Sequence, residues 1–309
     1  MNTESRVAVA SRSFSKHPQL RKELLAKYSN VTFNDGGSSL SDARLVEFLQ
    51  GHDKAIIALE YITDSILSQL PELKRISKIG VGLDKVDLQA MRARNIEFIW
   101  TPGVNKRSVA ELTLCFMLSV LRQISVADYN VRNGVFSSPT GGCLTGKTVG
   151  IIGCGNIGSD LVRLLEPFEC TLLVHDIAPN EEFFRSNNLV ACTLHHLLKE
   201  SDIVTVHVPL YDGTVNLLSS NEIALMKPTA ILINTARGGI VNEEALYEAL
   251  HAGKLGGAGI DVFTTEPPGE NALLSLPNVV VTPHIGAGTE EAILAMGRAA
   301  IEGLDRKAG

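Results

Sequence analysis

The stretch Thr148-Val149-Gly150-Ile151-Ile152-Gly153-Cys154-Gly155-Asn156-Ile157-Gly158 decides the fold of this chain. It begins as an apolar run of strand length and then carries three glycines at G-x-G-x-x-G spacing. A helical pattern follows, with apolar residues at positions 161, 162 and 165 on one face. The stretch therefore predicts a strand, a tight turn and the start of a helix.

Each glycine has its own expected role in binding a dinucleotide. Gly153 allows the tight turn, Gly155 lets the backbone approach a pyrophosphate, and Gly158 lets the helix pack closely on the strand. The N-terminus of the helix offers free N–H groups to phosphate oxygens. A second apolar run at residues 171–174 leads to Asp176, whose carboxylate can hold both hydroxyls of an adenosine ribose. Because tight turns that bind nothing also contain such glycines, the prediction depends on strand, helix and acid occurring together.

Length, composition and charge narrow the class of protein. A chain of 309 residues with 45% hydrophobic content is more naturally two domains than one. The formal charge of -6 and the absence of a basic run argue against nucleic acid as a partner. No stretch has the ~20 apolar residues of a membrane span, and the amino terminus lacks the apolar core of a signal peptide. We expect a cytoplasmic protein without a membrane partner.

The cysteines show no spacing typical of a metal site or a disulfide framework. We expect them to be reduced packing residues, and we expect no metal site. They are Cys115, Cys143, Cys154, Cys170 and Cys192.

The first hundred residues alternate short apolar runs with amphipathic segments, which predicts a parallel sheet. We expect strands near residues 7–10, 31–33, 55–59, 76–79 and 96–99, with helices at 41–50 and 66–70 between them. The fourth strand runs into Gly80-Val81-Gly82-Leu83-Asp84. Glycines at the carboxyl end of a strand can form a nest of N–H groups for an anion, although a plain tight turn would look the same. Val81 and Gly82 are therefore candidate substrate-binding residues.

A second doubly wound sheet is predicted for the rest of the chain. An apolar helix at residues 108–121 is interpreted as a hinge helix that is buried on both domains or in an oligomer, with packing inside one domain as the alternative. Residues 133–146, rich in Gly, Ser, Thr and Pro, predict a loop. Beyond Asp176 we expect strands at 203–208, 230–234, 258–262 and 279–281, and helices at 194–198, 221–226 and 243–252.

Three of these later strands each run into a chemically capable residue, namely Arg237, Glu266 and His284. In open α/β sheets the chemistry lies beyond the carboxyl ends of the strands, so the three can converge beside a cofactor. Arg237 would grip a substrate carboxylate or polarise a carbonyl, His284 would exchange a proton, and Glu266 would orient and support the imidazole. Taken singly, each could be a surface ion pair or a loop histidine. Together, downstream of a dinucleotide turn, they indicate hydride transfer to or from a hydroxy acid.

Several segments resemble the D-2-hydroxyacid dehydrogenase family, and within it the D-3-phosphoglycerate dehydrogenase branch that lacks a regulatory extension. The resemblance covers nearly the whole chain. The segments are Gly80-Val81-Gly82-Leu83-Asp84, Thr101-Pro102-Gly103-Val104-Asn105, Asn234-Thr235-Ala236-Arg237-Gly238-Gly239, Asp261-Val262-Phe263 to Glu266-Pro267, and Thr282-Pro283-His284-Ile285-Gly286.

The resemblance implies an NAD-dependent dehydrogenase, and a homodimer, in which Arg237, Glu266 and His284 form the catalytic trio. It implies a Rossmann NAD-binding domain of residues 103–284 and a flavodoxin-like substrate domain of residues 1–102 plus 285–309. Substrate-binding residues would be Val81, Gly82 and Arg237. Cofactor-binding residues would be Gly153, Gly155, Asn156, Ile157, Gly158, Asp176, Val208, Pro209, Thr235, Ala236, Asp261 and Gly286.

One stretch departs from the pattern of phosphoglycerate dehydrogenases, which place an Arg shortly after the third strand to meet the phosphate. This chain reads Ala58-Leu59-Glu60-Tyr61-Ile62-Thr63 there. Lys85, Lys106 or Arg107 could supply a positive charge instead, or could be solvated surface residues.

The predicted function is NAD-dependent interconversion of a D-2-hydroxy acid and its 2-keto acid. Among substrates, 3-phosphoglycerate is placed ahead of glyoxylate and hydroxypyruvate. An NAD(H)-sensing interaction protein on the same fold is the alternative of another class. A methyltransferase that uses the glycine turn for a different nucleotide would leave Arg237 and His284 without a role.

Overall fold

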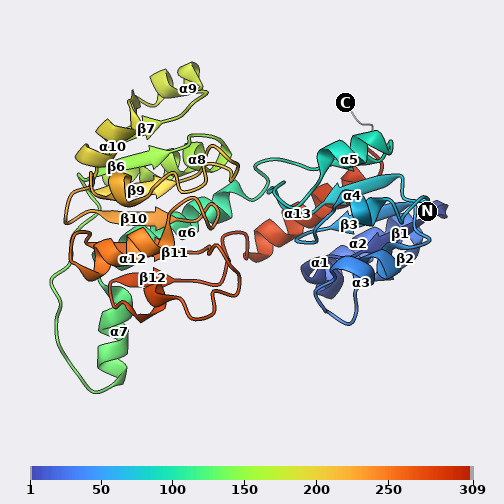
Figure 1. Ribbon diagram of the computed structural model, residues 1–309, viewed down its shortest axis with the longest axis horizontal. Coiled ribbons are helices and arrows are strands. Elements are labelled where there is room, and N and C mark those ends of the chain that lie inside the picture. Colours follow the sequence, from blue (N-terminus) through green and yellow to red (C-terminus); the bar gives the residue numbers. More distant parts are fainter. Residues whose placement is uncertain (1, 307–309) are drawn as a thin grey trace. The chain divides into compact units, whose positions relative to one another are not determined.

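The computed structural model describes residues 2–306, and the chain divides into two compact units of parallel α/β structure (Figure 1). The first unit comprises residues 1–105 and 287–309, and the second comprises residues 106–286. The chain thus crosses between the units after Asn105 and after Gly286, where the sequence places boundaries after residues 102 and 284.

The first unit is built on a sheet of five parallel strands in the order β2-β1-β3-β4-β5. This strand order is that of flavodoxin-like folds, whose right-handed crossovers leave helices on both faces of the sheet. Near-continuous apolar runs suit strands that are covered on both faces. The strands are β1 (Asn2–Val9), β2 (Tyr28–Phe33), β3 (Lys54–Ile57), β4 (Arg75–Lys78) and β5 (Glu97–Ile99).

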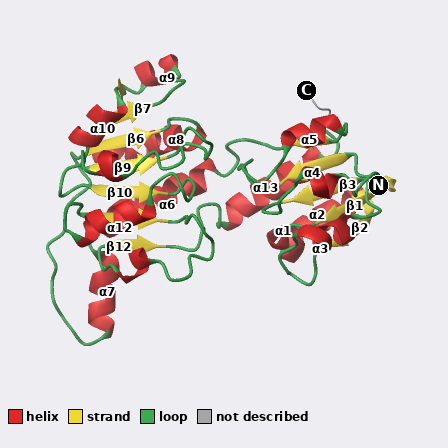
Figure 2. Cartoon of the chain, viewed as in Figure 1, coloured by secondary structure: helices red, strands yellow, loops and turns green. Residues whose placement is uncertain are grey.

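Helices cover both faces of this sheet, and the last of them comes from the carboxyl-terminal end of the chain (Figure 2). Met296, Ala300 and Ile301 of this last helix lie in one apolar cluster with Leu20 and Leu24. The helices are α1 (Arg12–Lys16), α2 (Pro18–Lys27), α3 (Asp42–Leu49), α4 (Asp64–Leu67), α5 (Leu88–Ala93) and α13 (Glu290–Gly303).

The second unit is built on a sheet of seven parallel strands in the order β12-β11-β10-β9-β6-β7-β8. The first strand of this unit, β6, lies inside the sheet. Strands β7 and β8 follow on one side of it and β9 to β12 on the other, which is the Rossmann arrangement. The strands are β6 (Thr148–Ile152), β7 (Thr171–His175), β8 (Val190–Ala191), β9 (Ile203–Val206), β10 (Ile231–Asn234), β11 (Gly257–Ile260) and β12 (Val279–Val281).

Two apolar clusters, one on each face of this sheet, form the core of the second unit. Helix α6 (Lys106–Leu121) supplies Phe116, Met117 and Val120 to one of them, together with Ile151 and Ile233. The other helices are α7 (Ile124–Arg132), α8 (Asn156–Leu165), η1 (Glu166–Phe168), α9 (Glu181–Ser186), α10 (Leu194–Glu200), α11 (Ser220–Ile223), α12 (Glu243–His251) and η2 (Ala272–Ser275). The sequence left two interpretations of the apolar helix at 108–121, a hinge helix and a helix packed inside one domain. The contacts of Phe116, Met117 and Val120 support packing inside one domain.

Side-chain caps explain where two short helices differ from the sequence expectation. Helix α4 starts at Asp64 because the Thr63 hydroxyl accepts a hydrogen bond from the Ile66 N–H at 3.4 Å, so the expected range of 66–70 was wrong. Helix α11 starts at Ser220 after a capping box formed by Ser219 and Glu222, and it ends before the expected residue 226. Helix α7 was missed because it buries none of its residues and has no core-facing stripe.

Among residues 2–306, no single helix is long and apolar enough to cross a membrane. Helices α6 and α7 meet the length and composition criteria only when taken as a pair, and that pair is bent by 62°.

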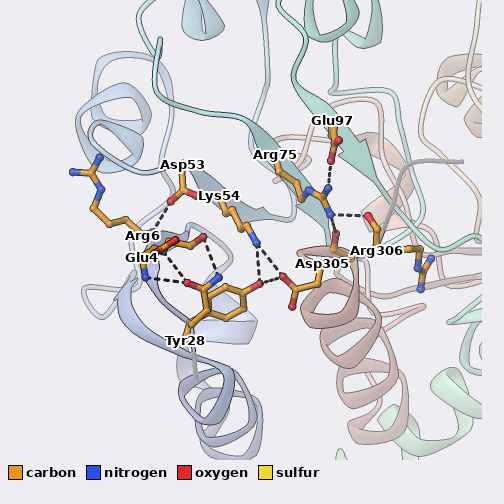
Figure 3. A network of polar contacts seen from close by, with 12 residues as sticks. Glu4, Arg6, Tyr28, Asp53, Lys54, Arg75, Glu97, Asp305 and Arg306 are labelled. Carbon is orange, nitrogen blue, oxygen red and sulfur yellow. Dashed lines mark hydrogen bonds and ion pairs between the residues drawn. The ribbon is translucent and has the colours of Figure 1, made fainter.

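A cluster of polar contacts fastens the carboxyl-terminal helix to the edge of the first sheet where its strands begin (Figure 3). The Tyr28 hydroxyl donates to Asp305 Oδ1 at 2.5 Å. Lys54 Nζ donates to the Tyr28 oxygen at 3.1 Å and to Asp305 Oδ1 at 3.0 Å, which closes a triangle. We call these three residues the C-terminal clasp. Because Tyr28 is fully buried, the clasp ties the end of α13 to the core of the first unit.

Arg75 completes this attachment at the end of α13. Its Nη1 donates to the carbonyl oxygens of Gly303 at 3.2 Å and Arg306 at 2.6 Å, and its Nη2 pairs with Glu97. The last carbonyls of a helix lack partners within the helix, so a guanidinium there satisfies them and complements the helix dipole.

The clasp has opposite effects on the pKa values of its two acids. Burial and the hydrogen bond to Asp305 raise the pKa of Tyr28 well above its usual value. Burial opposes ionisation of Asp305, but the hydrogen bonds from Tyr28 and Lys54 hold its pKa below the usual value. By linkage, the contribution of Asp305 is present above about pH 4 and lost as pH falls below it, while that of Tyr28 is present below about pH 10 and lost as pH rises.

We predict that Tyr28→Phe lowers the free energy of unfolding by about 1 kcal/mol at pH 7, because Lys54 and Asp305 lose the hydroxyl that they share. The variant should also show a smaller loss of stability above about pH 10, because no phenol is left to ionise at that site. Urea unfolding at pH 7 and pH 10.5 measures both effects. Tyr61→Phe, at a residue 57% exposed in the connection after β3, is the matched control. Equal stabilities of the two variants would contradict the clasp.

Candidate active site

The carboxyl ends of the strands in the second unit gather the predicted site residues at one edge of the sheet. Strands β10, β11 and β12 are neighbours, and they lead into Arg237, Glu266 and His284 respectively. Parallel pairing brings equivalent strand ends to the same edge. The fold therefore assembles at this edge side chains that are far apart in the sequence.

The glycine turn has the geometry that its spacing predicts. Gly153 has a φ of +90°, and a Cβ there would lie 2.8 Å from Val208 Cγ1. A Cβ on Gly158 would lie 2.3 Å from the Gly153 carbonyl oxygen, so only glycine allows this contact between α8 and the turn. A Cβ on Gly155 would meet nothing within 4 Å. The space beside Gly155, at the N-terminus of the ten-residue helix α8, fits the close approach of a pyrophosphate.

Asp176, directly after β7, is bonded to the glycine turn itself. Its Oδ2 accepts the Cys154 N–H at 2.6 Å, and its Oδ1 accepts the Ala178 N–H at 2.8 Å. A carboxylate has about four acceptor positions, so both oxygens keep capacity for ribose hydroxyls. Burial, and then the negative charge of Asp176, raise the pKa of the Cys154 thiol to about 11. Cys154 is therefore a neutral packing residue, and the chain's five cysteines are all free.

His284 lies in a turn that the buried carboxylate of Asp261 holds. Asp261 Oδ1 accepts the Thr282 hydroxyl at 2.5 Å and the Ile285 N–H at 2.7 Å, and Oδ2 accepts the Gly286 N–H at 2.8 Å. The His284 N–H donates to the Asp261 carbonyl at 2.9 Å. His284 itself has a φ of +55°, a left-handed conformation that few residues adopt without such support.

Glu266 and His284 form a direct pair. His284 Nδ1 lies 2.9 Å from Glu266 Oε2 and 3.1 Å from Oε1. Oε1 also accepts the Phe263 N–H at 3.2 Å. A carboxylate at Nδ1 fixes the proton there, so Nε2 is the nitrogen left to exchange a proton with a substrate. Both side chains stay about one-third exposed, at 35% for His284 and 38% for Glu266, which leaves the imidazole accessible.

Arg237 is positioned by a local turn built on Asn234, the last residue of β10. The buried Asn234 side chain accepts the Ala236 N–H at 3.1 Å and donates to the Arg237 carbonyl at 2.9 Å. Arg237 Nη1 donates to the Ala236 carbonyl at 2.7 Å. These bonds fix the backbone from which the guanidinium extends.

Thr235, a predicted cofactor residue, has its hydroxyl directed to α6. Thr113 Oγ1 donates to the Val109 carbonyl at 2.9 Å, so at 2.8 Å from Thr235 Oγ1 it must be the acceptor. Ser108, also on α6, donates to the Gly286 carbonyl at 2.6 Å. Helix α6 thus braces the ends of β10 and the His284 turn from one face.

The predicted substrate residues Val81 and Gly82 belong to the first unit, in the loop that follows β4. Gly80 starts this loop with a φ of +90°. In the preceding connection, after β3, Glu60 is buried and its Oε2 accepts the Ala58 N–H at 2.5 Å. Of the cations considered as substitutes for an arginine here, Arg107 pairs with Asp160 of the second unit at 2.9 Å.

The sequence reasoning missed several residues that support the site. Asn234 is the last residue of β10, and Glu243 is the first residue of α12. Polar residues at such positions could have been identified from the sequence as supports of the site. His207 lies just before the predicted residues Val208 and Pro209, and burial lowers its pKa to about 3. Its Nε2 lies 3.0 Å from Thr205 Oγ1, so the ring is a neutral part of the sheet edge.

Comparison with known proteins identifies the family. Residues 114–286 match the family described as D-isomer specific 2-hydroxyacid dehydrogenase, NAD binding domain. The chain is 39% identical over 253 residues to a hydroxypyruvate reductase of Thermotoga maritima, which covers 80% of this chain and 82% of that protein. It is 36% identical over 273 residues to a D-3-phosphoglycerate dehydrogenase of Methanocaldococcus jannaschii, which covers 87% of this chain. That match covers 52% of the relative, so the chain spans about half the length of the curated D-3-phosphoglycerate dehydrogenases that it matches.

A solved structure supports the same assignment. The D-lactate dehydrogenase of Aquifex aeolicus, complexed with NAD and lactic acid, matches with a TM-score of 0.84 at 27% identity and covers 97% of this chain and 93% of that chain. The chain belongs to the D-isomer specific 2-hydroxyacid dehydrogenase family, with an NAD binding domain in its second unit. The predicted family, the fold class of two doubly wound sheets and the NAD cofactor are confirmed.

We predict that NAD(H) is preferred over NADP(H) by about 10²-fold or more in kcat/KM, because a 2′-phosphate would meet the Asp176 carboxylate at close range. Asp176→Ala should narrow this preference by about tenfold. Glu181→Ala, at the first residue of α9 in the same connection, is the control that should leave it unchanged. Equal kcat/KM values for the two cofactors in the unmodified protein would refute the role of Asp176.

Proposed function

We propose that the chain is an NAD-dependent oxidoreductase that interconverts a D-2-hydroxy acid and its 2-keto acid. The observation that carries the proposal is the Glu266–His284 pair, held beside the Arg237 turn on neighbouring strand ends of an NAD binding domain. The second unit would bind the cofactor, and Val81 and Gly82, in the loop after β4, would bind the substrate. NAD, when bound, would supply or accept the hydride.

In this proposal His284 is the acid–base residue. When a keto acid is reduced, the imidazolium donates its Nε2 proton to the carbonyl oxygen, and in the reverse direction neutral Nε2 takes the hydroxyl proton. Glu266, against Nδ1, orients the ring and stabilises its charged form. Nε2 is the free ring nitrogen, which supports the assignment of the proton to that atom.

Arg237 would bind the carboxylate that all substrates of this class share. A guanidinium presents two parallel N–H groups that match the two oxygens of a carboxylate, which lysine cannot reproduce. The rigid turn around Asn234 supports this role, because a fixed backbone places the fork with little loss of side-chain freedom.

The first substrate expected from the sequence is 3-phosphoglycerate, but the connection after β3 supports an unphosphorylated substrate such as hydroxypyruvate or glyoxylate instead. In place of an arginine, it holds the buried carboxylate of Glu60, while Leu59 and Tyr61 beside it are more than half exposed. A phosphate close to Glu60 would meet a like charge. The cations at this connection are lysines rather than an arginine: Lys78 Nζ donates to the Ala58 carbonyl, and Lys85 Nζ lies 4.8 Å from the centroid of the Tyr61 ring. The relative from Thermotoga maritima, named a hydroxypyruvate reductase, is consistent with this preference.

We also propose that the chain works as a homodimer, and that helix α7 forms the contact. None of the nine residues of α7 is buried, and it carries exposed apolar side chains together with the loop that follows it. Exposed apolar side chains gathered on one segment support an interface, and a two-fold axis would place the same segment on both partners. The residues are Ile124, Tyr129, Val131, Val135 and Phe136. The cytoplasmic location stays a prediction.

The proposed activity predicts NADH oxidation with 2-keto acids, measured by absorbance over a panel of glyoxylate, hydroxypyruvate, pyruvate and 3-phosphohydroxypyruvate. His284→Asn should lower the single-turnover rate by about 10² to 10⁴ while NADH binding is retained. Near-normal single turnover in this variant would rule out the assigned role of His284. An NADH sensor would instead bind NADH tightly and turn over no acid in the panel.

For the dimer, we predict that Phe136→Glu shifts the protein to a monomer, because a charge at a buried apolar contact costs several kcal/mol unless it is paired. Sedimentation velocity measures the change. Leu25→Glu, at a partly exposed leucine of α2 in the first unit, should leave the dimer intact. A monomeric unmodified protein, or a dimer that tolerates Phe136→Glu, would contradict the proposed interface.

A further inference from the structure

The loop that carries Glu266 is not held by burial. Residues 264–267 are all exposed, and the loop runs from the end of β11 to the 3-10 helix η2. Phe263, just before this segment, is buried. The exposed segment itself can open easily, so the position of a side chain on it depends on polar contacts. Proton exchange at His284 needs the Glu266 carboxylate within hydrogen-bond reach of Nδ1. Within the loop the Phe263 N–H donates to Glu266 Oε1, and polar contacts from outside the loop can fix its two ends.

Glu243 holds both ends of this loop. Its Oε1 accepts the Thr264 N–H at 2.6 Å and the Thr264 hydroxyl at 2.7 Å. Its Oε2 accepts Asn271 Nδ2 at 2.6 Å. One carboxylate thus bridges residues 264 and 271, with Glu266 between them. Hydrogen bonds to an ionised acceptor are about twice as strong as neutral ones, so the bridge is a firm one.

The anchor points of this bridge are themselves well fixed. Glu243 is the first residue of α12, whose N-cap Asn242 accepts the Ala245 N–H at 2.9 Å. A carboxylate is favoured in the first turn of a helix by the helix dipole. At the other end, Asn271 Oδ1 accepts the Leu273 N–H at 3.0 Å and caps η2. The bridge therefore connects two helix starts of the same unit.

The Thr264 end of the bridge also contacts the loop that carries Arg237. A Cβ added to Gly238 would lie 2.0 Å from the Phe263 carbonyl carbon and 2.3 Å from the Thr264 nitrogen. Gly238 therefore packs directly on the peptide whose N–H is bonded to Glu243. A displacement of this peptide would disturb the connections of both Glu266 and Arg237.

We propose that Glu243 is a positioning residue for the proton-exchange pair, acting through the Thr264–Asn271 bridge to keep Glu266 against His284. The expected change in the reaction rate rests on the proposed function, whereas the expected change in the position of Glu266 does not. Without the bridge the carboxylate of Glu266 spends less time at Nδ1, and the imidazolium loses part of its support. The other charged residues on the strand ends packed beside His284 are Asp261 and Arg237.

The test compares Glu243→Gln with Glu244→Gln, its exposed neighbour on the same helix turn. We expect Glu243→Gln to slow the single-turnover rate about tenfold, to leave the dissociation constant of NADH within twofold, and to move the acid–base limb of the pH profile to lower pH. Glu244→Gln should match the unmodified protein in all three. A Glu243→Gln protein with an unchanged rate and pH profile would overturn the proposal.

A measurement without turnover separates this inference from the proposed function. The pH midpoint of the His284 imidazole signal, followed by nuclear magnetic resonance in the protein without substrate, should fall in Glu243→Gln and in Glu266→Gln. In the double variant Glu243→Gln should add no further fall, because its effect passes through Glu266. Additive falls would show a separate action of Glu243 and would overturn the proposal, even if no acid proves to be a substrate.

If Glu243→Gln does not fold, the milder variant Thr264→Val tests the same bridge. Thr264→Val removes one of the three hydrogen bonds and keeps the shape of the side chain. It should slow the single-turnover rate about threefold and move the His284 midpoint in the same direction as Glu266→Gln. Folded Thr264→Val protein with an unchanged midpoint and rate would count against the bridge.

Discussion

The buried carboxylate of Asp261 is the constraint on which the chemistry of the second unit depends. Its three hydrogen bonds hold the turn that follows β12, and its own carbonyl fixes the backbone of His284 in a left-handed conformation. A buried acid that lacked these partners would be costly, so the turn and the acid stabilise each other. The position of His284 is thus set by the end of the neighbouring strand as well as by its own.

A common arrangement recurs at three strand ends of this edge. In each case a polar side chain at or just after a strand end satisfies backbone groups of a loop at this edge. Asn234 holds the loop after its own strand β10, Asp261 holds the turn after the neighbouring β12, and Asp176 holds the glycine turn after the neighbouring β6. The apolar strands below cannot do this, because their side chains are buried in the two core clusters. Parallel pairing therefore places the loops at one edge, and these side chains determine their shape.

The sequence predicted what depends on local pattern and spacing. The glycines at positions 153, 155 and 158, the trio at the strand ends and most strands follow from periodicity and turn chemistry, so the doubly wound fold could be inferred. Contacts between segments far apart in the chain have no such local signature. The bond of Glu243 to Asn271 joins two residues that are 28 positions apart in the sequence. The clasp joins Tyr28 to Asp305, which are 277 positions apart. Helix α7 was missed for a related reason, since none of its residues is buried and its pattern therefore reflects no core.

The exposure of the Glu266 loop follows from what the proposed reaction requires. A proton-exchanging imidazole has to be reached by a substrate, so the side chains of His284 and Glu266 cannot both be buried to fix their geometry. Burying the pair would also penalise its charged form, which the reaction uses. Polar bridges from a rigid helix start can position an exposed loop without closing access to it. This explains why a carboxylate with three hydrogen bonds, rather than an apolar contact, connects α12 to the loop that carries Glu266.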